Sequence, residues 1–157
     1  MNQADVDTVM LAWVRLIRAQ TRVVSNVEAA LKAKGYPPLA WYDVLLELSR
    51  NGGRKLRPVE LEKELLVAQY NLSRLIDRME EAGLLAREPC DGDGRGPLVA
   101  LTPRGKVMQK QMWPHCRDAV LAEMSALNLP DIARLGKLLE PWGGRNPSAK
   151  SSCTESS

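Results

Sequence analysis

Polar side chains that can contact nucleic-acid bases gather within a short stretch in the middle of the chain. They are Gln69, Tyr70, Asn71, Ser73 and Arg74, with Arg78 one helical turn further on. Gln and Asn amides can bind adenine through two hydrogen bonds, Arg suits guanine or a phosphate, and Ser or Tyr can donate to phosphate oxygens. The stretch therefore indicates a helix that reads double-stranded DNA. The alternative is that it is only the solvated face of an ordinary helix.

A second candidate lies in the glycine-rich run of residues 91–97. Arg95 stands there among glycines and a proline, a composition that suits the tip of a β-hairpin. A guanidinium at such a tip can enter the minor groove, where A·T-rich sequence attracts positive charge. Asp93 can pair with Arg95 or brace the hairpin. The alternative is a surface ion pair of little energetic value.

Basic residues also flank these two segments, and we expect some of them to contact phosphates. The flanking residues are Arg54, Lys55, Arg57, Arg87, Arg104 and Lys106. With 22 Lys and Arg residues against 19 Asp and Glu residues, the net charge of the 157-residue chain is only +3. Any affinity for DNA must therefore come from where the charges lie rather than from their sum.

The elements that position these residues follow from the spacing of apolar side chains. Intervals of three and four predict helices over residues 6–31, 40–50, 58–66, 69–82, 103–125 and 129–140. The fifth should be interrupted at Trp113-Pro114, where the proline should kink it. Only Val67 and Ala68 separate the third helix from the fourth, which predicts a helix-turn-helix. Short β-prone runs at residues 84–89 and 98–101 flank the glycine-rich run and predict a hairpin, or wing.

Together these elements predict a mainly α fold with a small β-hairpin, namely a winged helix-turn-helix flanked by N- and C-terminal helices. We expect an N-terminal dimerisation helix at 1–34, a DNA-binding domain at 35–106, C-terminal helices at 107–142 and a disordered tail at 143–157, all in one compact subunit. A first helix of more than about 25 residues usually needs a partner surface beyond its own domain. A second copy of the chain is the simplest partner.

Several other classes of protein are disfavoured by composition. Cys90, Cys116 and Cys153 are widely spaced and form no C-x-x-C pair, which argues against a disulfide framework and a zinc site and favours a reducing cytoplasm. His115 is the only histidine and lacks suitably spaced ligands, so we expect no metal and no cofactor. No apolar run approaches the length of a membrane span. No spacing of nucleophile, base or paired carboxylates predicts a catalytic site.

The residues that carry these patterns resemble the signature of MarR-type regulators. The sequence reads QYNLSRLIDRMEEAGLLAR over residues 69–87, DGR over 93–95 and LVALT over 98–102, followed by Gly105. In that family a G-L-L/V-x-R segment follows the recognition helix, D-x-R forms the wing tip and L-V-x-L-T-x-x-G closes the hairpin. The resemblance covers nearly the whole chain, since the long first helix and the closing C-terminal helices at 107–142 are similar to the dimerisation helices of that family. It implies a homodimer whose recognition helices enter the major groove of a pseudo-palindromic operator, with Arg95 in the minor groove.

The resemblance also implies repression, and release of DNA by a small effector such as an aromatic acid. Residues that could stack on a ring or neutralise a carboxylate are Trp13, Arg15, Tyr36, Trp41, Trp113 and His115. The alternative is that these aromatic rings are core or dimer packing and that the arginine is solvated. Cys90, at the base of the wing, is the thiol whose oxidation could disturb DNA contact.

Two helix starts depart from the pattern of that family. Ala68 stands where a Ser or Thr usually caps the recognition helix, and Arg57 replaces a usual cap before Pro58. Each departure should weaken a helix start by about 1 kcal/mol. A rival interpretation of the whole chain is a winged helix that contacts a protein partner and has no role on DNA. The polar recognition helix favours DNA, because a protein contact would favour an apolar patch there.

Overall fold

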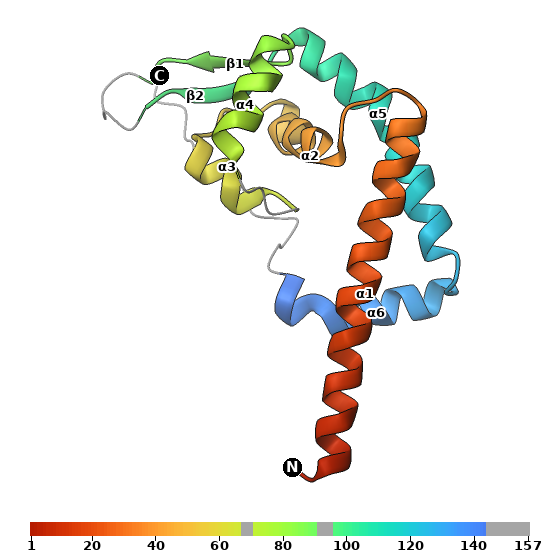
Figure 1. The fold of residues 1–157 in the computed structure, drawn as a ribbon. Coiled ribbons are helices and arrows are strands. Elements are labelled where there is room, and N and C mark those ends of the chain that lie inside the picture. The colour runs from red at the N-terminus through yellow and green to blue at the C-terminus, as the bar shows by residue number, and fades with distance from the viewer. Residues whose placement is uncertain (67–70, 91–95, 144–157) are drawn as a thin grey trace. The chain divides into compact units, whose positions relative to one another are not determined.

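The computed structural model describes residues 1–66, 71–90 and 96–143, which form helices and one small hairpin (Figure 1). The helices are α1 (Gln3–Ala33), α2 (Leu39–Ser49), α3 (Pro58–Glu64), α4 (Leu72–Glu81), α5 (Pro103–Met124) and α6 (Leu129–Gly143), with a 3-10 turn, η1 (Arg50–Gly52), after α2. The strands are β1 (Leu85–Glu88) and β2 (Leu98–Leu101). The chain divides into two compact units, Met1–Glu123 and Met124–Ser157. The predicted mainly α fold with a hairpin is thereby confirmed.

The hairpin follows directly from α4. Gly83 has φ +75°, a left-handed conformation that suits glycine, and it turns the chain from the end of α4 into β1. Strands β1 and β2 are antiparallel, with Leu85 opposite Leu101 and Glu88 opposite Leu98. Leu56 and Val99 exchange two backbone hydrogen bonds of 3.1 and 2.8 Å, so the segment before α3 pairs with β2 on its other side. The wing is thus anchored to the helix-turn-helix by backbone bonds.

Side-chain caps set the start of several helices. Asn2 and Asp5 form a capping box at the start of α1. Thr102 Oγ1 accepts the Gly105 N–H at 3.0 Å and donates to the Gly83 carbonyl at 2.6 Å, so it both caps α5 and ties it to the turn after α4. Asn128 Oδ1 accepts the Asp131 N–H at 2.9 Å and so caps the start of α6.

Three expectations about helix ends require correction. Helix α4 starts at Leu72 rather than at residue 69, and its N-cap is Asn71, so Ala68 is not a missing cap. Helix α5 continues through Pro114 without interruption. Helix α6 continues through Pro141 to Gly143, which therefore does not belong to a tail. Residues 144–157 lie outside the described part of the chain.

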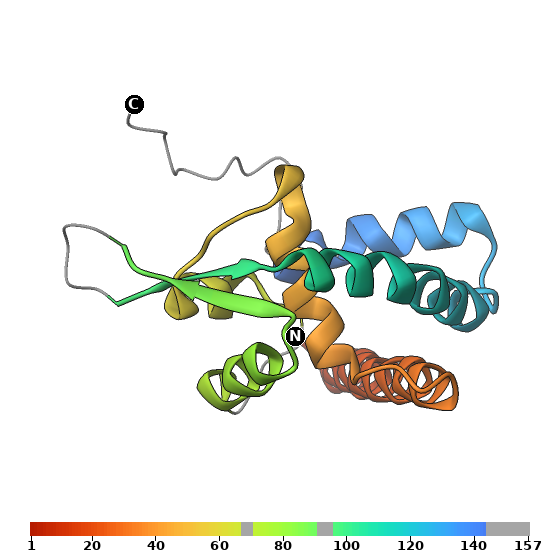
Figure 2. The same ribbon diagram turned by 90° about the horizontal axis from the view of Figure 1, so that it is seen from above.

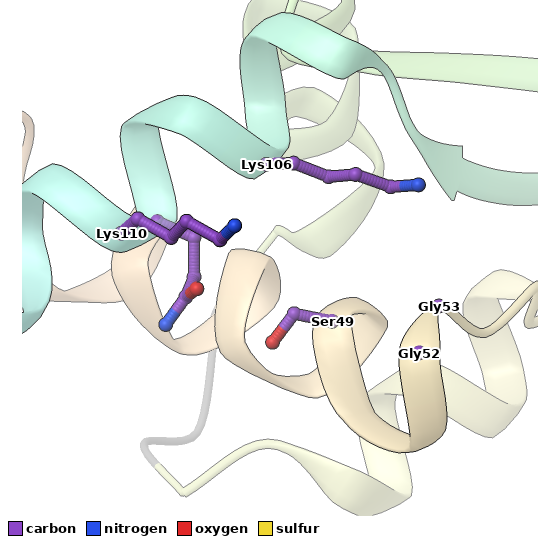
Figure 3. A pocket seen from close by; sticks show the side chains of 6 residues that line it. Ser49, Gly52, Gly53, Lys106 and Lys110 are labelled. Carbon is purple, nitrogen blue, oxygen red and sulfur yellow. The ribbon is translucent and has the colours of Figure 1, made fainter.

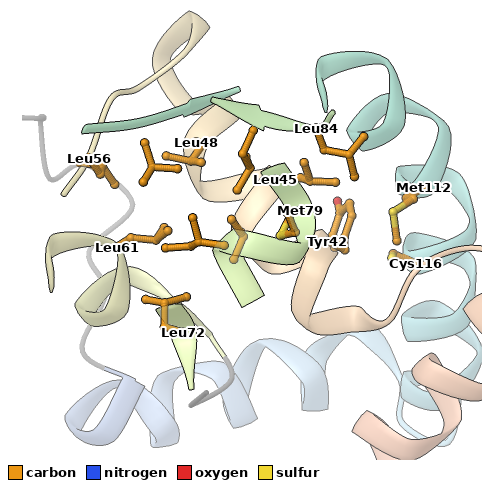
Figure 4. Close-up of a cluster of buried hydrophobic side chains, with 14 of the residues drawn as sticks. Tyr42, Leu45, Leu48, Leu56, Leu61, Leu72, Met79, Leu84, Met112 and Cys116 are labelled. Atoms are coloured by element: carbon orange, nitrogen blue, oxygen red, sulfur yellow. The ribbon is translucent and has the colours of Figure 1, made fainter. Parts of the chain in front are cut away.

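The hydrophobic core lies around α2 (Figure 4). Leu45 and Leu48 of α2 are fully buried, and α3, α4 and the hairpin pack around them. The fully buried side chains from these neighbouring elements include Leu61, Ile76, Met79 and Val99. The C-terminal end of α1 joins this core through Leu31, and α5 joins it through Met112. The core therefore fixes the positions of α3, α4 and the wing relative to α2.

Most of the apolar stripe of α1 does not reach the core. Among its residues only Val27 and Leu31 are buried. The N-terminal part exposes Val9, Met10, Leu11, Trp13, Leu16 and Ile17, each between 40% and 56% accessible. So many exposed apolar side chains on one helix usually mark an interaction surface. Within the described ranges, no helix has the length and apolar character needed to cross a bilayer.

Candidate nucleic-acid interface

Helix α4 has one buried face and one exposed polar face. Leu72, Ile76 and Met79 are at most 8% exposed and hold the helix against the core. The exposed face carries Ser73, Arg74, Asp77, Arg78 and Glu81. Three of the predicted DNA contacts, Ser73, Arg74 and Arg78, therefore lie on the side of α4 that a groove could approach.

The first turn of α4 places a fourth predicted contact, Asn71, at the exposed N-terminus of the helix. The Asn71 side chain Oδ1 accepts the Arg74 backbone N–H at 3.1 Å. This bond uses the amide oxygen and leaves the amide nitrogen as a donor. Asn71 therefore has a structural role as N-cap besides any role in reading a base. Gln69, Tyr70, Asp93 and Arg95, the other predicted contacts, lie outside the described residues.

A buried carboxylate positions the turn that precedes α4. Asp43 of α2 is only 4% exposed, and its Oδ2 accepts the Leu66 backbone N–H at 2.7 Å. Leu66 follows α3 in the turn of the helix-turn-helix. Sequence reasoning did not identify Asp43. The available signal was one carboxylate within the otherwise apolar start of α2, which is the pattern of a buried acid with a specific partner.

A second contact ties α4 to the wing. The Arg87 guanidinium of β1 contacts Asp77 Oδ1 at 2.6 Å and Glu80 Oε1 at 3.2 Å. The hydrogen bond to Asp77 raises the pKa of Arg87 above its ordinary value, and the nearby charge of Glu80 acts in the same direction. Arg87 therefore neutralises two acids of α4.

Three other flanking basic residues have acidic partners near the hairpin. Lys55 contacts Glu88 at 2.6 Å. Arg54, whose side chain is 11% exposed, lies 3.7 Å from buried Glu47. Arg57 lies 3.7 Å from Glu60, whose carboxylate also accepts the Arg57 backbone N–H at 2.8 Å. That backbone bond supplies part of the cap that the Arg57 side chain cannot, because a guanidinium has no acceptor.

The candidate effector residues fall into separate places. Tyr36 and His115 come together, with ring centroids 5.0 Å apart and planes inclined by 37°. Trp41 is partly buried and packs on the core. Trp13, Arg15 and Trp113 are exposed on α1 and α5. The structure thus assembles two of the six candidates into one contact.

The two described cysteines differ in environment. Cys116 is buried, and this burial raises the pKa of its thiol to about 11. Neighbouring Tyr42 is buried as well, and the pKa of its hydroxyl is raised to about 12, mainly by burial and then by the charge of Cys116. Cys90 is partly exposed, and its Sγ lies 3.5 Å from the Arg57 guanidinium. Of the two, Cys90 is the thiol that solvent can reach.

Comparison with known proteins shows similarity to the MarR family both in a family model and in a curated relative. The family model described as the MarR family matches residues 34–96. The multiple antibiotic resistance protein MarR of Salmonella typhimurium is 43% identical over 86 residues, which is 54% of this chain and 60% of that protein. The chain thus spans less than two thirds of that curated relative.

Solved structures of similar fold match over more of the chain. AbsC, a MarR family transcriptional regulator from Streptomyces coelicolor, superposes with a TM-score of 0.75 and 29% identity, covering 86% of this chain and 91% of AbsC. Sco3205, another MarR family regulator from that organism, was solved in complex with DNA. It gives a TM-score of 0.74 and 28% identity over 84% of this chain and 83% of Sco3205. The class predicted from the sequence, a regulator rather than an enzyme, is the class of each of these proteins.

Proposed function

Because this chain belongs to the MarR family of winged helix-turn-helix regulators, we propose that it binds a specific DNA sequence and regulates transcription from it. The observation that carries the proposal is the exposed polar face of α4, which presents Ser73, Arg74 and Arg78 while the opposite face is buried. Helix α4 is also held to the wing through Arg87. A rigidly positioned helix of this composition suits the major groove. The DNA complex of Sco3205 supports the same function.

We propose further that the acting species is a homodimer. The support is the exposed apolar part of α1, residues 9–17, which a second copy of the chain would cover. A two-fold dimer presents two α4 helices and therefore favours a pseudo-palindromic operator. The variant L16E introduces a charge on this surface. S25E is the matched control, because residue 25 lies nine positions further along the helix and thus on its opposite side.

Sedimentation of the three proteins tests the dimer. The unchanged protein and S25E should sediment as dimers at micromolar concentration, and L16E should shift towards monomer. A dimer that tolerates L16E as well as it tolerates S25E would place the interface elsewhere.

Selection from a random double-stranded DNA library tests the DNA function. We expect enrichment of two half-sites about one helical turn apart, with affinity that falls steeply as salt rises. The R74A and R78A variants should weaken binding to the selected site. Failure to enrich any motif would favour the rival function, a winged helix that contacts a protein.

We propose repression relieved by a small aromatic acid as the mode of regulation. Its support is the contact between Tyr36 and His115, whose two rings could extend to a third. Titration of the protein–operator complex with 4-hydroxybenzoate should release DNA, and the Y36L and H115L variants should need higher concentrations. Release that is identical in all three proteins would show that this ring contact does not bind the acid.

A further inference from the structure

A cleft of about 260 Å³ lies between the end of α2 and the first half of α5 (Figure 3). Its lining consists of Ser49, Gly52, Gly53, Lys106, Gln109 and Lys110. Two of these six residues are basic and none is acidic or aromatic. The cleft therefore differs in chemistry from the Tyr36–His115 contact, which is built from rings.

The two lysines face the cleft from one side of α5. Lys106 and Lys110 are four residues apart, so they stand about 6 Å apart along the helix axis on the same face. Figure 3 shows both side chains extending from α5 beside the end of α2. Within the part of the chain that the structure describes, neither lysine has an acidic partner. Like charges at this spacing repel each other, and an anion between them would remove that repulsion.

The backbone carbonyls at the end of α2 do not need these lysines. The Glu47 carbonyl accepts the Arg50 N–H, and the Leu48 carbonyl accepts the Arg54 N–H at 2.8 Å. The Leu46 carbonyl accepts the Ser49 hydroxyl at 2.7 Å. Lysines beside a helix C-terminus often serve to satisfy such carbonyls. Here backbone and hydroxyl donors already do so, and the ammonium groups are left for another acceptor.

The opposite wall of the cleft is kept open by two glycines. Gly52 has φ +81° and Gly53 has φ +122°, so the backbone there favours glycine. A Cβ added to either residue would meet no atom within 4 Å, which shows that the space beside them is empty. The turn therefore leaves room for a ligand rather than for a packed side chain.

Ser49 adds a second requirement on the ligand. Because its hydroxyl proton points to the Leu46 carbonyl, the Ser49 oxygen presents lone pairs to other groups. An acceptor of this kind pairs with a hydroxyl or amine of a ligand. The Gln109 amide offers one donor group and one acceptor group at the same place.

We propose that this cleft binds a small phosphomonoester that also carries a hydroxyl group, with the phosphate between Lys106 and Lys110 and the hydroxyl donating to Ser49. Lysine ammonium groups bind phosphate as point charges. The volume suits a compact polyol phosphate. In Figure 2 the turn after α2 and helix α4 lie on opposite sides of the hairpin, so a phosphate in this cleft belongs to a free ligand and not to DNA bound by α4.

Calorimetric titration of the DNA-free protein with glycerol 3-phosphate tests the proposal. We expect saturable binding of one molecule per chain, and no binding of glycerol. The K106Q/K110Q variant should bind about tenfold more weakly, since it loses two charge-assisted hydrogen bonds. The control K63Q/K137Q removes the same total charge from exposed lysines outside the cleft and should bind as the unchanged protein does. Absence of saturable binding, or equal weakening in both double variants, would overturn the site.

Two further measurements test whether the ligand hydroxyl contacts Ser49 and whether the bound phosphate belongs to a free ligand or to DNA. S49A should lower the affinity for glycerol 3-phosphate but not for methyl phosphate, and equal effects on both would remove the hydroxyl from the proposal. DNA affinity should be the same in K106Q/K110Q as in K63Q/K137Q. A selectively lower DNA affinity in K106Q/K110Q would assign the lysines to a DNA phosphate and overturn the free ligand. The titration itself needs no DNA, so its result is independent of the proposed DNA function.

Discussion

The carboxylate of Asp43 in α2 accepts the backbone N–H of Leu66 across 23 residues of sequence, at 2.7 Å. The acceptor is buried in the core helix, and the donor belongs to the turn between α3 and α4. This hydrogen bond thus connects the core helix α2 to the segment between α3 and α4. A charged acceptor makes this bond stronger than one between neutral groups.

We predict that D43A weakens binding to the selected DNA more than its loss of stability explains. The substitution leaves the Leu66 N–H without this acceptor, at a cost of about 1–3 kcal/mol, and loosens the turn before α4. Hydrogen exchange of the Leu66 amide should accelerate, and D43N, which keeps an acceptor oxygen, should restore part of both properties. The control is E47Q, a change at another buried acid of α2, which lies 3.1 Å from Arg50 and 3.7 Å from Arg54. If E47Q accelerates exchange at Leu66 as much as D43A does, the specific role of Asp43 is wrong.

Asn71 offers a way to separate capping from base reading. N71A removes both the cap and the amide, whereas N71S keeps a capping oxygen and removes only the amide. We expect N71A to lower the free energy of unfolding by about 1 kcal/mol and N71S to leave it nearly unchanged. Both variants should relax the preference at one base pair of the operator by about 1–3 kcal/mol. Full specificity in N71S would show that Asn71 is only a cap. Thermal unfolding and competition binding on single-base operator variants measure the two effects.

The Arg87 contacts predict a charge effect that a second substitution should reverse. R87Q leaves Asp77 and Glu80 without their cation, and these acids lie on the helix that we propose enters the DNA groove. We expect operator affinity to fall about tenfold at low salt, and the deficit to shrink as salt screens the carboxylates. R87Q/D77N should recover part of the affinity, because the uncompensated charge is gone. A double variant no better than R87Q would mean that Arg87 contacts DNA directly.

The raised pKa of Cys116 predicts a loss of stability at alkaline pH. Well below pH 9, the ordinary pKa of a thiol, Cys116 is protonated in both the folded and the unfolded chain, so its contribution to stability is constant. Between pH 9 and about 11 the unfolded chain loses the proton while the buried thiol keeps it, and stability falls with rising pH. The loss at pH 11 should reach about 2 kcal/mol relative to pH 8. The free energy of unfolding of C116A, measured with urea, should not show this loss between pH 8 and pH 11. Equal slopes for C116A and the unchanged protein would contradict the assignment.

Apolar spacing in the sequence predicted the helices better than it predicted where α4 begins. Helices α1, α2, α3, α5 and α6 were predictable from apolar residues at intervals of three and four. The start of α4 was placed too early, because polar residues before Leu72 carry no periodicity that separates a cap from a first turn.

The features that sequence reasoning missed depend on contacts distant in sequence. Asp43 looks like an ordinary helical acid until the Leu66 N–H is placed beside it. Lys106 was expected to contact a phosphate, yet its place beside Ser49 and Gly53 depends on how α5 packs on the end of α2. The sequence identifies Lys106 as a basic residue, but only the packing of α5 on the end of α2 shows that it lines a cleft.

Gly105 illustrates a packing constraint that can be tested against an unconstrained glycine. A Cβ at Gly105 would collide with the backbone carbonyl oxygen of Leu84 and lie 3.1 Å from Leu101 Cδ2, and a backbone atom cannot move aside as a side chain does. This close approach brings the start of α5 against the turn between α4 and β1, where Thr102 also bonds to Gly83. We therefore predict that G105A lowers the free energy of unfolding by about 1–3 kcal/mol, despite the higher helix propensity of alanine.

The matched control is Gly136 in α6, where a Cβ would meet no atom within 4 Å. There G136A should stabilise its helix by up to about 1 kcal/mol through propensity alone. Urea unfolding followed by circular dichroism measures both variants. G105A should also weaken operator binding, because displacement of β1 shifts Arg87 away from Asp77 and Glu80. A G105A protein as stable as the unchanged chain would show that α5 can move away from Leu84 without cost, and the close contact would then have no role in holding the wing to α4.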